Sequence, residues 1–349
     1  MVNNRTLDND TLEMLSNNMI KNTLPVIYLI VAIISLPGNG FSLFLLSKTQ
    51  PKTPSVIFMM NLTITDLVLA IFLPFQSAYH WNGNNWTFGV NLCNVVTVLF
   101  YANMYCSILT MTCISLDRYI GVVLPMRFSK WRKNKYALAI CLGMWALILV
   151  VLLPLEVKDL TYKVINLNIT TCFDVLKMDM LPSKAAWAAF LFTLFGILFV
   201  IPFSITVYCY TRIISKLIMT SAGYLSAQKR RAISLATIVL LVFITCFAPN
   251  NIILFIHIIN RIFWDKGVYT AYKVTLTLSC LNSCLDPFIY YFASKEFRKK
   301  LRTFLGLATT SSQGSFTEYR RESFLSRSGL QSHHQLEMQL SLNSANGSA

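Results

Sequence analysis

Seven stretches of predominantly apolar residues alternate along the chain with short polar segments. A helix that crosses the hydrocarbon core of a bilayer needs roughly 20 such residues, and each stretch reaches that length. The stretches lie at about 24–48, 54–80, 91–122, 135–155, 181–214, 232–260 and 267–293. They predict an all-α fold in which seven membrane-spanning helices form one bundle, residues 24–293.

Two segments after the bundle have a different pattern. Residues 294–305 carry apolar side chains on one helical face and basic side chains on the other, which predicts a short amphipathic helix on the membrane surface. The apolar face holds Phe297, Leu301, Phe304 and Leu305. Residues 306–349 are rich in Ser, Thr, Gln and Asn and have no apolar periodicity, so we expect a disordered tail.

The distribution of charge predicts how the helices are oriented. Charged residues make up 13% of the chain and the formal net charge is +15, whereas soluble domains average about 25% charged residues. Seventeen of the 30 Lys and Arg residues follow the first, third, fifth and seventh stretches. Because positive residues concentrate on the cytoplasmic side of membrane proteins, the N-terminus is expected outside and the C-terminus inside. The basic surplus therefore indicates topology rather than a nucleic-acid partner.

Sequons and cysteines agree with this orientation. Four Asn-X-Thr sequons fall on the expected outer side and are candidates for glycosylation, two of them in the N-terminal segment 1–23. The four asparagines are Asn4, Asn9, Asn85 and Asn168. Seven of the nine cysteines lie within helices, and the other two, Cys93 and Cys172, face the oxidising side. A disulfide between these two is the most economical interpretation.

Several ionisable residues lie within the apolar stretches. Asp66, Asp286 and the pair Asp117-Arg118 are the clearest cases, and ionisable groups at membrane depth usually indicate function. Polar neighbours lie on other helices: Asn39, Asn61, Asn103, Ser107, Asn282 and Ser283. These groups could instead hold helices together by hydrogen bonds. Repulsion between two carboxylates is relieved by a proton, a cation or a hydrogen-bond network, and oxygen ligands favour a hard cation such as sodium.

A set of motifs, taken in order, resembles the rhodopsin-like (class A) family of G-protein-coupled receptors. The motifs are Gly38-Asn39, Asn61 to Asp66, Trp86 to Gly89 with Cys93, Asp117-Arg118-Tyr119, Trp145 with Pro154, Pro202 with Tyr210, Phe243 to Pro249, and Asp286-Pro287-Phe-Ile-Tyr290. The resemblance spans residues 24–305 and implies a plasma-membrane receptor that signals through a heterotrimeric G protein, receptor kinases and arrestin.

Roles within the family transfer to matching positions. The resemblance implies that Arg118, paired at rest with Asp117, is released to contact the G protein. The residues expected to carry activation are Asp117, Arg118, Tyr119, Pro125, Met126, Tyr210, Phe243, Phe247, Pro249, Asp286, Pro287 and Tyr290. A sodium pocket is expected at Asp66, Asn103, Ser107, Asn282 and Asp286. Sodium is the only cofactor that the resemblance implies.

Two departures from the family pattern indicate which branch of the family the chain resembles. Asp286 replaces the usual Asn and Phe247 replaces the usual Trp. At both positions the chain resembles one branch of the family, which contains purinoceptors, lysophospholipid receptors and protease-activated receptors. Within it, the chain is most similar to metabotropic purinoceptors over residues 55–62, 100–105, 172–177 and 246–251. The branch also suggests coupling to the twelve/thirteen class of Gα and onward to Rho, with the Gi and Gq classes as alternatives.

Basic residues are expected around the outer mouth of the bundle, above aromatic ones. The predicted ligand contacts are Lys158, Lys177, Lys184, His257, Arg261 and Lys273, with Tyr101, Tyr105 and Tyr272. This pattern favours an extracellular acidic amphiphile, such as a lysophospholipid or a lipid conjugate. A rim lysine could equally anchor a helix end near lipid headgroups. A nucleotide is the alternative ligand, but Asn251, Leu254 and Leu276 stand where nucleotide-binding members of the branch carry basic or His residues.

Other protein classes find little support in the sequence. No HExxH motif, P-loop or nucleophile elbow is present, so an enzyme is not expected. A transporter or channel would use buried acids and kinked helices but has no need of Asp117-Arg118-Tyr119 at a basic face. An opsin needs a lysine where this chain has Cys280.

Overall fold

The computed structural model describes residues 9–124, 133–175, 180–220, 226–264, 268–293 and 301–302. The chain divides into two compact units, Met1–Phe297 and Arg298–Ala349. Of the second unit only Leu301 and Arg302, which are helical, are described. The fold described below is therefore that of the first unit.

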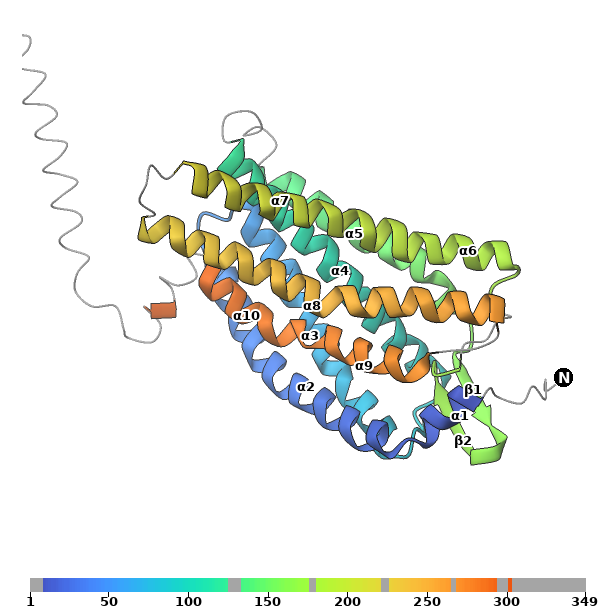
Figure 1. Ribbon diagram of the computed structural model, residues 1–349. Coiled ribbons are helices and arrows are strands. Elements are labelled where there is room, and N and C mark those ends of the chain that lie inside the picture. Colours follow the sequence, from blue (N-terminus) through green and yellow to red (C-terminus); the bar gives the residue numbers. More distant parts are fainter. Residues whose placement is uncertain are drawn as a thin grey trace, which may run out of the picture. The chain divides into compact units, whose positions relative to one another are not determined.

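Long antiparallel helices form a bundle around a central helix, as Figure 1 shows. The helices are α2 (Asn18–Ser47), α3 (Pro54–Trp81), α4 (Val90–Val123), α5 (Asn134–Val157), a continuous run of α6 (Lys184–Phe192), η3 (Thr193–Val200) and α7 (Ile201–Met219), then α8 (Ala227–Trp264), α9 (Tyr269–Cys280) and α10 (Asn282–Ala293). Among the described residues, six of these spans are long and apolar enough to cross a membrane. The seventh consists of α9 and α10, which a turn at Leu281 separates. The architecture is the predicted seven-helix bundle, in which α4 is the most deeply buried span.

Polar residues start several of the helices. The side chain of Asn17 accepts a hydrogen bond from the backbone N–H of Met19 at 2.9 Å, so α2 begins before the apolar stretch predicted from residue 24. Ser183 caps α6 by accepting from the N–H of Ala186 at 3.1 Å. Such caps satisfy backbone donors that have no partner within the helix.

The predicted span 181–214 contains a change of helix type. Residues Thr193–Val200 form a π-helix, and the α-helical pattern resumes at Ile201, next to Pro202. Proline lacks the N–H that would donate to the preceding turn, and π-segments within α-helices are frequent at functional sites. The sequence predicts a helix disturbed at Pro202, but not the π-helical segment before it.

A β-hairpin covers one end of the bundle, which we call the hairpin end. Strand β1 (Thr161–Val164) pairs antiparallel with β2 (Ile169–Cys172) through the 3-10 turn η2 (Ile165–Leu167). A disulfide joins Cys172 to Cys93 at the start of α4, with an S–S distance of 2.03 Å. This is the pairing that the sequence predicts, although the hairpin itself is not.

A short helix α1 (Asn9–Ser16) also lies at the hairpin end (Figure 1). Its Met14 and Leu15 are fully buried, and the Leu15 carbonyl accepts a hydrogen bond from the Asn84 side chain at 2.9 Å. The N-terminal segment, predicted as polar and glycosylated, therefore contributes apolar side chains to the bundle.

Some predicted features lie outside the described residues. These are Asn4, Pro125, Met126, Lys177, the side chains of Asn9, Arg261 and Tyr290, the amphipathic helix 294–305 apart from Leu301 and Arg302, and the tail 306–349. Their expected roles stay predictions.

Candidate functional site

An apolar cavity of about 30 Å³ lies inside the hairpin end of the bundle. Helices α4, α5, α6, α8 and α9 contribute to its wall, together with residues of the segment after β2. The lining residues are Tyr101, Leu155, Phe173, Met180, Trp187, Phe190, Leu194, Leu254, His257, Ile258, Tyr269 and Tyr272. This volume holds a few water molecules at most, so the cavity is nearly filled by its own side chains.

Aromatic rings form one wall of this cavity. The hydroxyls of Tyr101 and Tyr272 are hydrogen-bonded to each other across α4 and α9. The imidazole of His257 stacks on Tyr272, with ring centroids 5.5 Å apart and an interplanar angle of 13°. Phe173 packs against Tyr101 in a T-shaped contact, with ring centroids 5.7 Å apart. These contacts join α4, α8, α9 and the segment that follows the hairpin.

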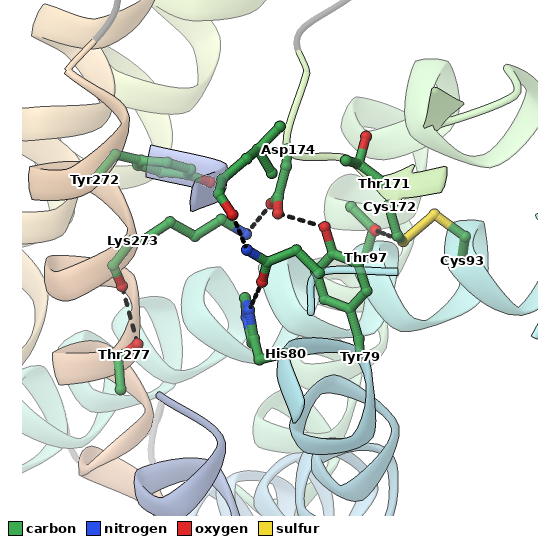
Figure 2. A network of polar contacts seen from close by, with 12 residues as sticks. Tyr79, His80, Cys93, Thr97, Thr171, Cys172, Asp174, Tyr272, Lys273 and Thr277 are labelled. Carbon is green, nitrogen blue, oxygen red and sulfur yellow. Dashed lines mark hydrogen bonds and ion pairs between the residues drawn. A yellow bond between two sulfur atoms is a disulfide. The ribbon is translucent and has the colours of Figure 1, made fainter. Parts of the chain in front are cut away.

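A buried ion pair lies next to the aromatic wall, as Figure 2 shows. The ammonium of Lys273 on α9 pairs with the carboxylate of Asp174, and the two side chains are 8% and 0% exposed. The second oxygen of Asp174 accepts a hydrogen bond from the hydroxyl of Tyr79 on α3 at 2.6 Å. Asp174 follows Cys172 by two residues, so the disulfide holds its backbone near α4. Burying two charges is costly, and pairing with additional hydrogen bonds offsets that cost.

Near the ion pair, a further set of polar side chains connects the end of α3 to α1. Nδ1 of His80 lies 2.7 Å from the side-chain oxygen of Asn84, whose amide donates to the Leu15 carbonyl. Tyr28 of α2 stacks on His80 at 5.9 Å between ring centroids. Nε2 of His80 is buried and has no hydrogen-bond partner among the described residues. The hairpin end thus encloses a polar compartment beside the apolar one.

The predicted ligand contacts divide into three groups. Tyr101, His257 and Tyr272 line the cavity, and Lys273 adjoins it as half of the ion pair. The exposed Lys158 and Lys184 and the fully buried Tyr105 are not among the lining residues.

Sequence reasoning missed the cluster of Phe173, Asp174, Tyr79 and His80. A single Asp in a loop carries no signal for burial, although its position two residues after a predicted disulfide cysteine was a usable hint.

Two carboxylates occupy the middle of the bundle, on α3 and α10. Asp66 accepts from the Asn103 amide at 3.1 Å, and Asp286 accepts from the Asn282 amide at 2.9 Å. Both acids are fully buried. The side chains of Asp66 and Asp286 also hydrogen-bond to each other, whereas Oγ of Ser107 and Oδ1 of Asn282 have no hydrogen-bond partner among the described residues. Within that part of the chain no group of three or more His, Cys, Asp or Glu could hold a metal, so any cation would rely on neutral oxygens as well.

Other polar residues within the helices join neighbouring spans. The Asn61 amide donates to Thr110 at 2.9 Å, while its oxygen accepts from the Trp145 indole at 3.0 Å, which links α3, α4 and α5. The Asn39 amide donates to the Ser283 carbonyl at 2.8 Å and links α2 to α10. For Asn39 and Asn61, the interpretation that a polar residue holds helices together therefore fits.

The opposite end of the bundle, which we call the Arg118 end, holds the Asp117-Arg118-Tyr119 motif. The carboxylate of Asp117 accepts a hydrogen bond from the Ser55 hydroxyl at the start of α3. Arg118, Tyr210 and Asp286 line a cavity of about 20 Å³ that extends from this end toward the buried acids. Tyr210 packs with Ile213, Ala236 and Val239, and its hydroxyl has no partner among the described residues.

A column of phenylalanines runs along α7 and α8 between the two ends. Phe203 stacks on Phe243 at 5.9 Å, and Phe243 meets Phe247, two residues before Pro249, at 5.5 Å. Closer to the hairpin end, Phe195 of the π-helix stacks on Phe255 at 4.3 Å. Phe243, one of the residues expected to carry activation, therefore contacts the span that contains the π-helix, and Phe247 contacts Phe243.

Comparisons with known proteins agree with this architecture. The family model described as 7 transmembrane receptor (rhodopsin family) matches residues 38–290. Purinoceptor 8 of Gallus gallus is 61% identical over 299 residues, which cover 85% of this chain and 84% of the relative. The S-geranylgeranyl-glutathione receptor of Homo sapiens is 59% identical over 300 residues, 86% and 84% of the two chains. Proteinase-activated receptor 2 of Rattus norvegicus is 44% identical over 285 residues, 81% and 71%. The predicted similarity to metabotropic purinoceptors is confirmed.

Proposed function

Because the chain belongs to the rhodopsin family of seven-transmembrane receptors, we propose that it responds to an extracellular acidic lipid conjugate by activating the twelve/thirteen class of Gα. The family membership makes it a multi-pass plasma-membrane receptor that couples to heterotrimeric G proteins, and not an enzyme. The ligand class and the Gα class are the parts that need testing.

The observation that carries the ligand proposal is the position of Lys273. Lys273 directly follows Tyr272, which lines the apolar cavity, and its buried ammonium pairs with Asp174, the neighbour of the lining residue Phe173. Ligand sites usually combine a mostly apolar wall with a few polar groups that fix orientation. An anionic head near Lys273 and an apolar tail in the cavity would use both compartments.

The name of a relative supports the same chemistry. The human relative is named a receptor for S-geranylgeranyl-glutathione, a molecule that joins an isoprenoid tail to a peptide bearing carboxylates. Such a conjugate carries an anionic group that could pair with Lys273 and an apolar tail that matches the apolar lining of the cavity. Nucleotides remain less suitable because Leu254 and Leu276 are buried apolar residues, and Asn251 donates to the Phe247 carbonyl at 2.9 Å within its own helix.

The proposal puts the hairpin end outside the cell and the Arg118 end in the cytoplasm. The disulfide and the sequons at Asn85 and Asn168 belong to the hairpin end, and disulfides persist in oxidising compartments. Lysines and arginines concentrate after the first, third, fifth and seventh spans, which agrees with the positive-inside rule. The choice of the twelve/thirteen class rests on resemblance to the branch alone.

A sodium ion between α3 and α10 forms a second part of the proposal. The carboxylates of Asp66 and Asp286 and the unpartnered oxygens of Ser107 and Asn282 suit a hard cation, which takes oxygen ligands. When bound, the ion would neutralise part of the repulsion between the two carboxylates and favour the resting state. If agonist potency in sodium-free choline medium equals that in sodium medium, for both wild type and Asp66→Asn, the sodium proposal is wrong.

The main experiment is a G-protein dissociation assay over all Gα classes in transfected cells. S-geranylgeranyl-glutathione is the test ligand, with glutathione and a panel of nucleotides as comparators. We expect dissociation of the twelve/thirteen class with S-geranylgeranyl-glutathione alone, and none in Arg118→Ala. Lys273→Met should weaken the response, whereas Lys158→Met, at an exposed lysine, should not.

Two outcomes would overturn the parts of this proposal separately. A response to nucleotides but not to the lipid conjugate would reject the ligand class. Dissociation of only Gi or Gq by the lipid conjugate would keep the ligand class and reject the Gα class.

A further inference from the structure

The two residues that follow the disulfide cysteine Cys172 lie in different environments, one apolar and one charged. The ring of Phe173 lines the apolar cavity and contacts Tyr101. The carboxylate of the next residue, Asp174, is fully buried and pairs with Lys273. This dipeptide therefore presents an apolar group to the apolar compartment and an anion to the buried cation.

Two consecutive residues of α9 receive this dipeptide. Tyr272 lines the cavity, and Lys273 binds Asp174 (Figure 2). Tyr79 adds a hydroxyl donor to the same carboxylate at 2.6 Å. Lys273 and Tyr79 thus form an anion site whose present occupant is a side chain of the receptor itself.

The size of the cavity shows that it does not accept a lipid tail in this state. Its volume of about 30 Å³ is far below the roughly 300–1,000 Å³ of ordinary ligand pockets. Binding an amphiphile therefore requires side chains to leave, and Phe173 is a lining residue that belongs to neither a helix nor a strand and is joined directly to Asp174.

The backbone conformation of Phe173 favours movement of this residue out of the cavity. Its φ is 58°, in the left-handed region that residues with a side chain rarely adopt. A conformation of this kind persists only while surrounding contacts hold it. The Lys273–Asp174 pair and the Tyr101 contact are such contacts, so losing them would also release backbone strain.

We propose that Phe173-Asp174 is an internal occupant of the ligand site, and that an acidic amphiphile binds by displacing Asp174 from Lys273 and Phe173 from the cavity. The inference deepens the proposed function and rests on it for the ligand class. It also predicts selectivity for an anionic head. A neutral lipid that displaced Phe173 would leave a buried charge without its partner, which is strongly unfavourable, whereas a ligand anion replaces Asp174 at Lys273.

The first test needs no ligand. Leu254→Cys places a thiol on the cavity wall, and its rate of modification by an uncharged methanethiosulfonate reagent reports how often the site opens. If Asp174 holds the site closed, Asp174→Asn should raise this rate by about tenfold or more, because the open population limits access. Asp159→Asn, at an exposed loop carboxylate, should leave the rate unchanged.

Controls keep this test decisive. The receptor without Leu254→Cys gives the background from native cysteines, and Ile258→Cys, also on the cavity wall, replaces Leu254→Cys if that variant fails to reach the cell surface. An unchanged rate in Asp174→Asn at both positions would overturn the inference whatever the ligand is.

The second test uses S-geranylgeranyl-glutathione as the probe. Asp174→Asn should lower its half-maximal concentration about tenfold by removing the internal competitor. The same substitution in a Lys273→Met background should give no such gain, because residues that share one interaction are not additive. A weaker response in Asp174→Asn, at equal surface expression, would contradict displacement and make Asp174 a ligand contact or a structural residue.

The two tests separate the inference from the proposed function. Faster modification in Asp174→Asn with no response of any variant to S-geranylgeranyl-glutathione would support the internal occupant and reject that ligand. Slow, unchanged modification with a normal wild-type response would support the ligand and reject the internal occupant.

Discussion

The side-chain oxygen of Asn85 accepts a hydrogen bond from the backbone N–H of Thr170 at 2.9 Å. The carbonyl of Thr170 in turn accepts from the N–H of Trp86 at 2.6 Å. The segment before α4 therefore forms hydrogen bonds with both the N–H and the C=O of Thr170 in β2. Asn85 is thus a structural residue as well as a sequon asparagine, since glycosylation modifies the amide nitrogen and leaves this oxygen free to accept.

Two ways of removing the Asn85 sequon should differ in their effect on stability. Asn85→Ala removes both the sequon and the acceptor for Thr170, at a cost of about 1 kcal/mol in the free energy of unfolding. Thr87→Ala removes only the sequon, because Thr87 is exposed. Thermal unfolding of the two purified variants measures the difference. Equal midpoints, both below wild type, would mean that the glycan alone matters.

Removing a hydroxyl from Tyr79 should be more harmful than removing one from Tyr105. Both tyrosines are fully buried, but only Tyr79 donates to a carboxylate, and Tyr105 has no hydroxyl partner among the described residues. Because hydrogen bonds to charged groups contribute about 1.5–3 kcal/mol, Tyr79→Phe should lower the unfolding midpoint and Tyr105→Phe should not. The comparison fails if Tyr105→Phe destabilises the receptor as much.

Gly38 and Gly40 on α2 should respond differently to the same substitution. A Cβ at Gly38 would lie 3.2 Å from Cγ of Pro287 on α10, whereas a Cβ at Gly40 would meet nothing within 4 Å. Gly38→Leu should therefore cost about 1–3 kcal/mol by overpacking, and Gly40→Leu much less. Surface expression and thermal stability of the two variants measure this. Because Pro287 follows Asp286, we also expect altered basal signalling in Gly38→Leu alone.

The hydrogen bond between Asn61 and Trp145 should appear as a coupling in a double-mutant cycle. The indole of Trp145 donates to the Asn61 oxygen at 3.0 Å, and hydrogen bonds between membrane helices average about 0.6 kcal/mol, with a maximum near 1.7. The cycle of Asn61→Ala and Trp145→Phe should give a coupling in this range. A control cycle with Trp264→Phe, at an exposed position at the end of α8, should give none. A coupling of zero in the first cycle would reject the bond.

The helices were predictable because a helix that spans a bilayer needs a long apolar run and satisfies its backbone hydrogen bonds within itself. The start of α2 was not, because residues 18–23 are mostly polar yet remain helical beyond the apolar run. The break at Leu281 and the π-helix at Thr193–Val200 change backbone hydrogen bonds without changing hydrophobicity. The pattern of apolar residues therefore does not predict them.

The candidate site was predictable only in part, for a related reason. Tyr101, His257 and Tyr272 follow from the expected place of their helix ends at the outer mouth of the bundle, and all three line the cavity. Asp174 and Lys273 are far apart in sequence, and their pairing depends on where a four-residue hairpin strand and a disulfide carry the chain. Strands this short produce no reliable alternation of polar and apolar residues, so the position of Asp174 required the tertiary structure.

Tyr210 should matter for signalling and not for the stability of the resting receptor. Its hydroxyl is buried without a partner among the described residues, while its ring packs with Ile213, Ala236 and Val239. Removing an unsatisfied buried hydroxyl is neutral or stabilising, so Tyr210→Phe should keep or raise the unfolding midpoint of the ligand-free receptor. If the hydroxyl instead supports Arg118 after activation, as the family resemblance implies, the same variant should reduce G-protein dissociation at saturating ligand. Tyr162→Phe, in β1 at the hairpin end, is the matched control and should signal normally. Full signalling by Tyr210→Phe at normal surface expression would mean that the hydroxyl has no part in activation, and a lower midpoint would mean that it has a resting-state role.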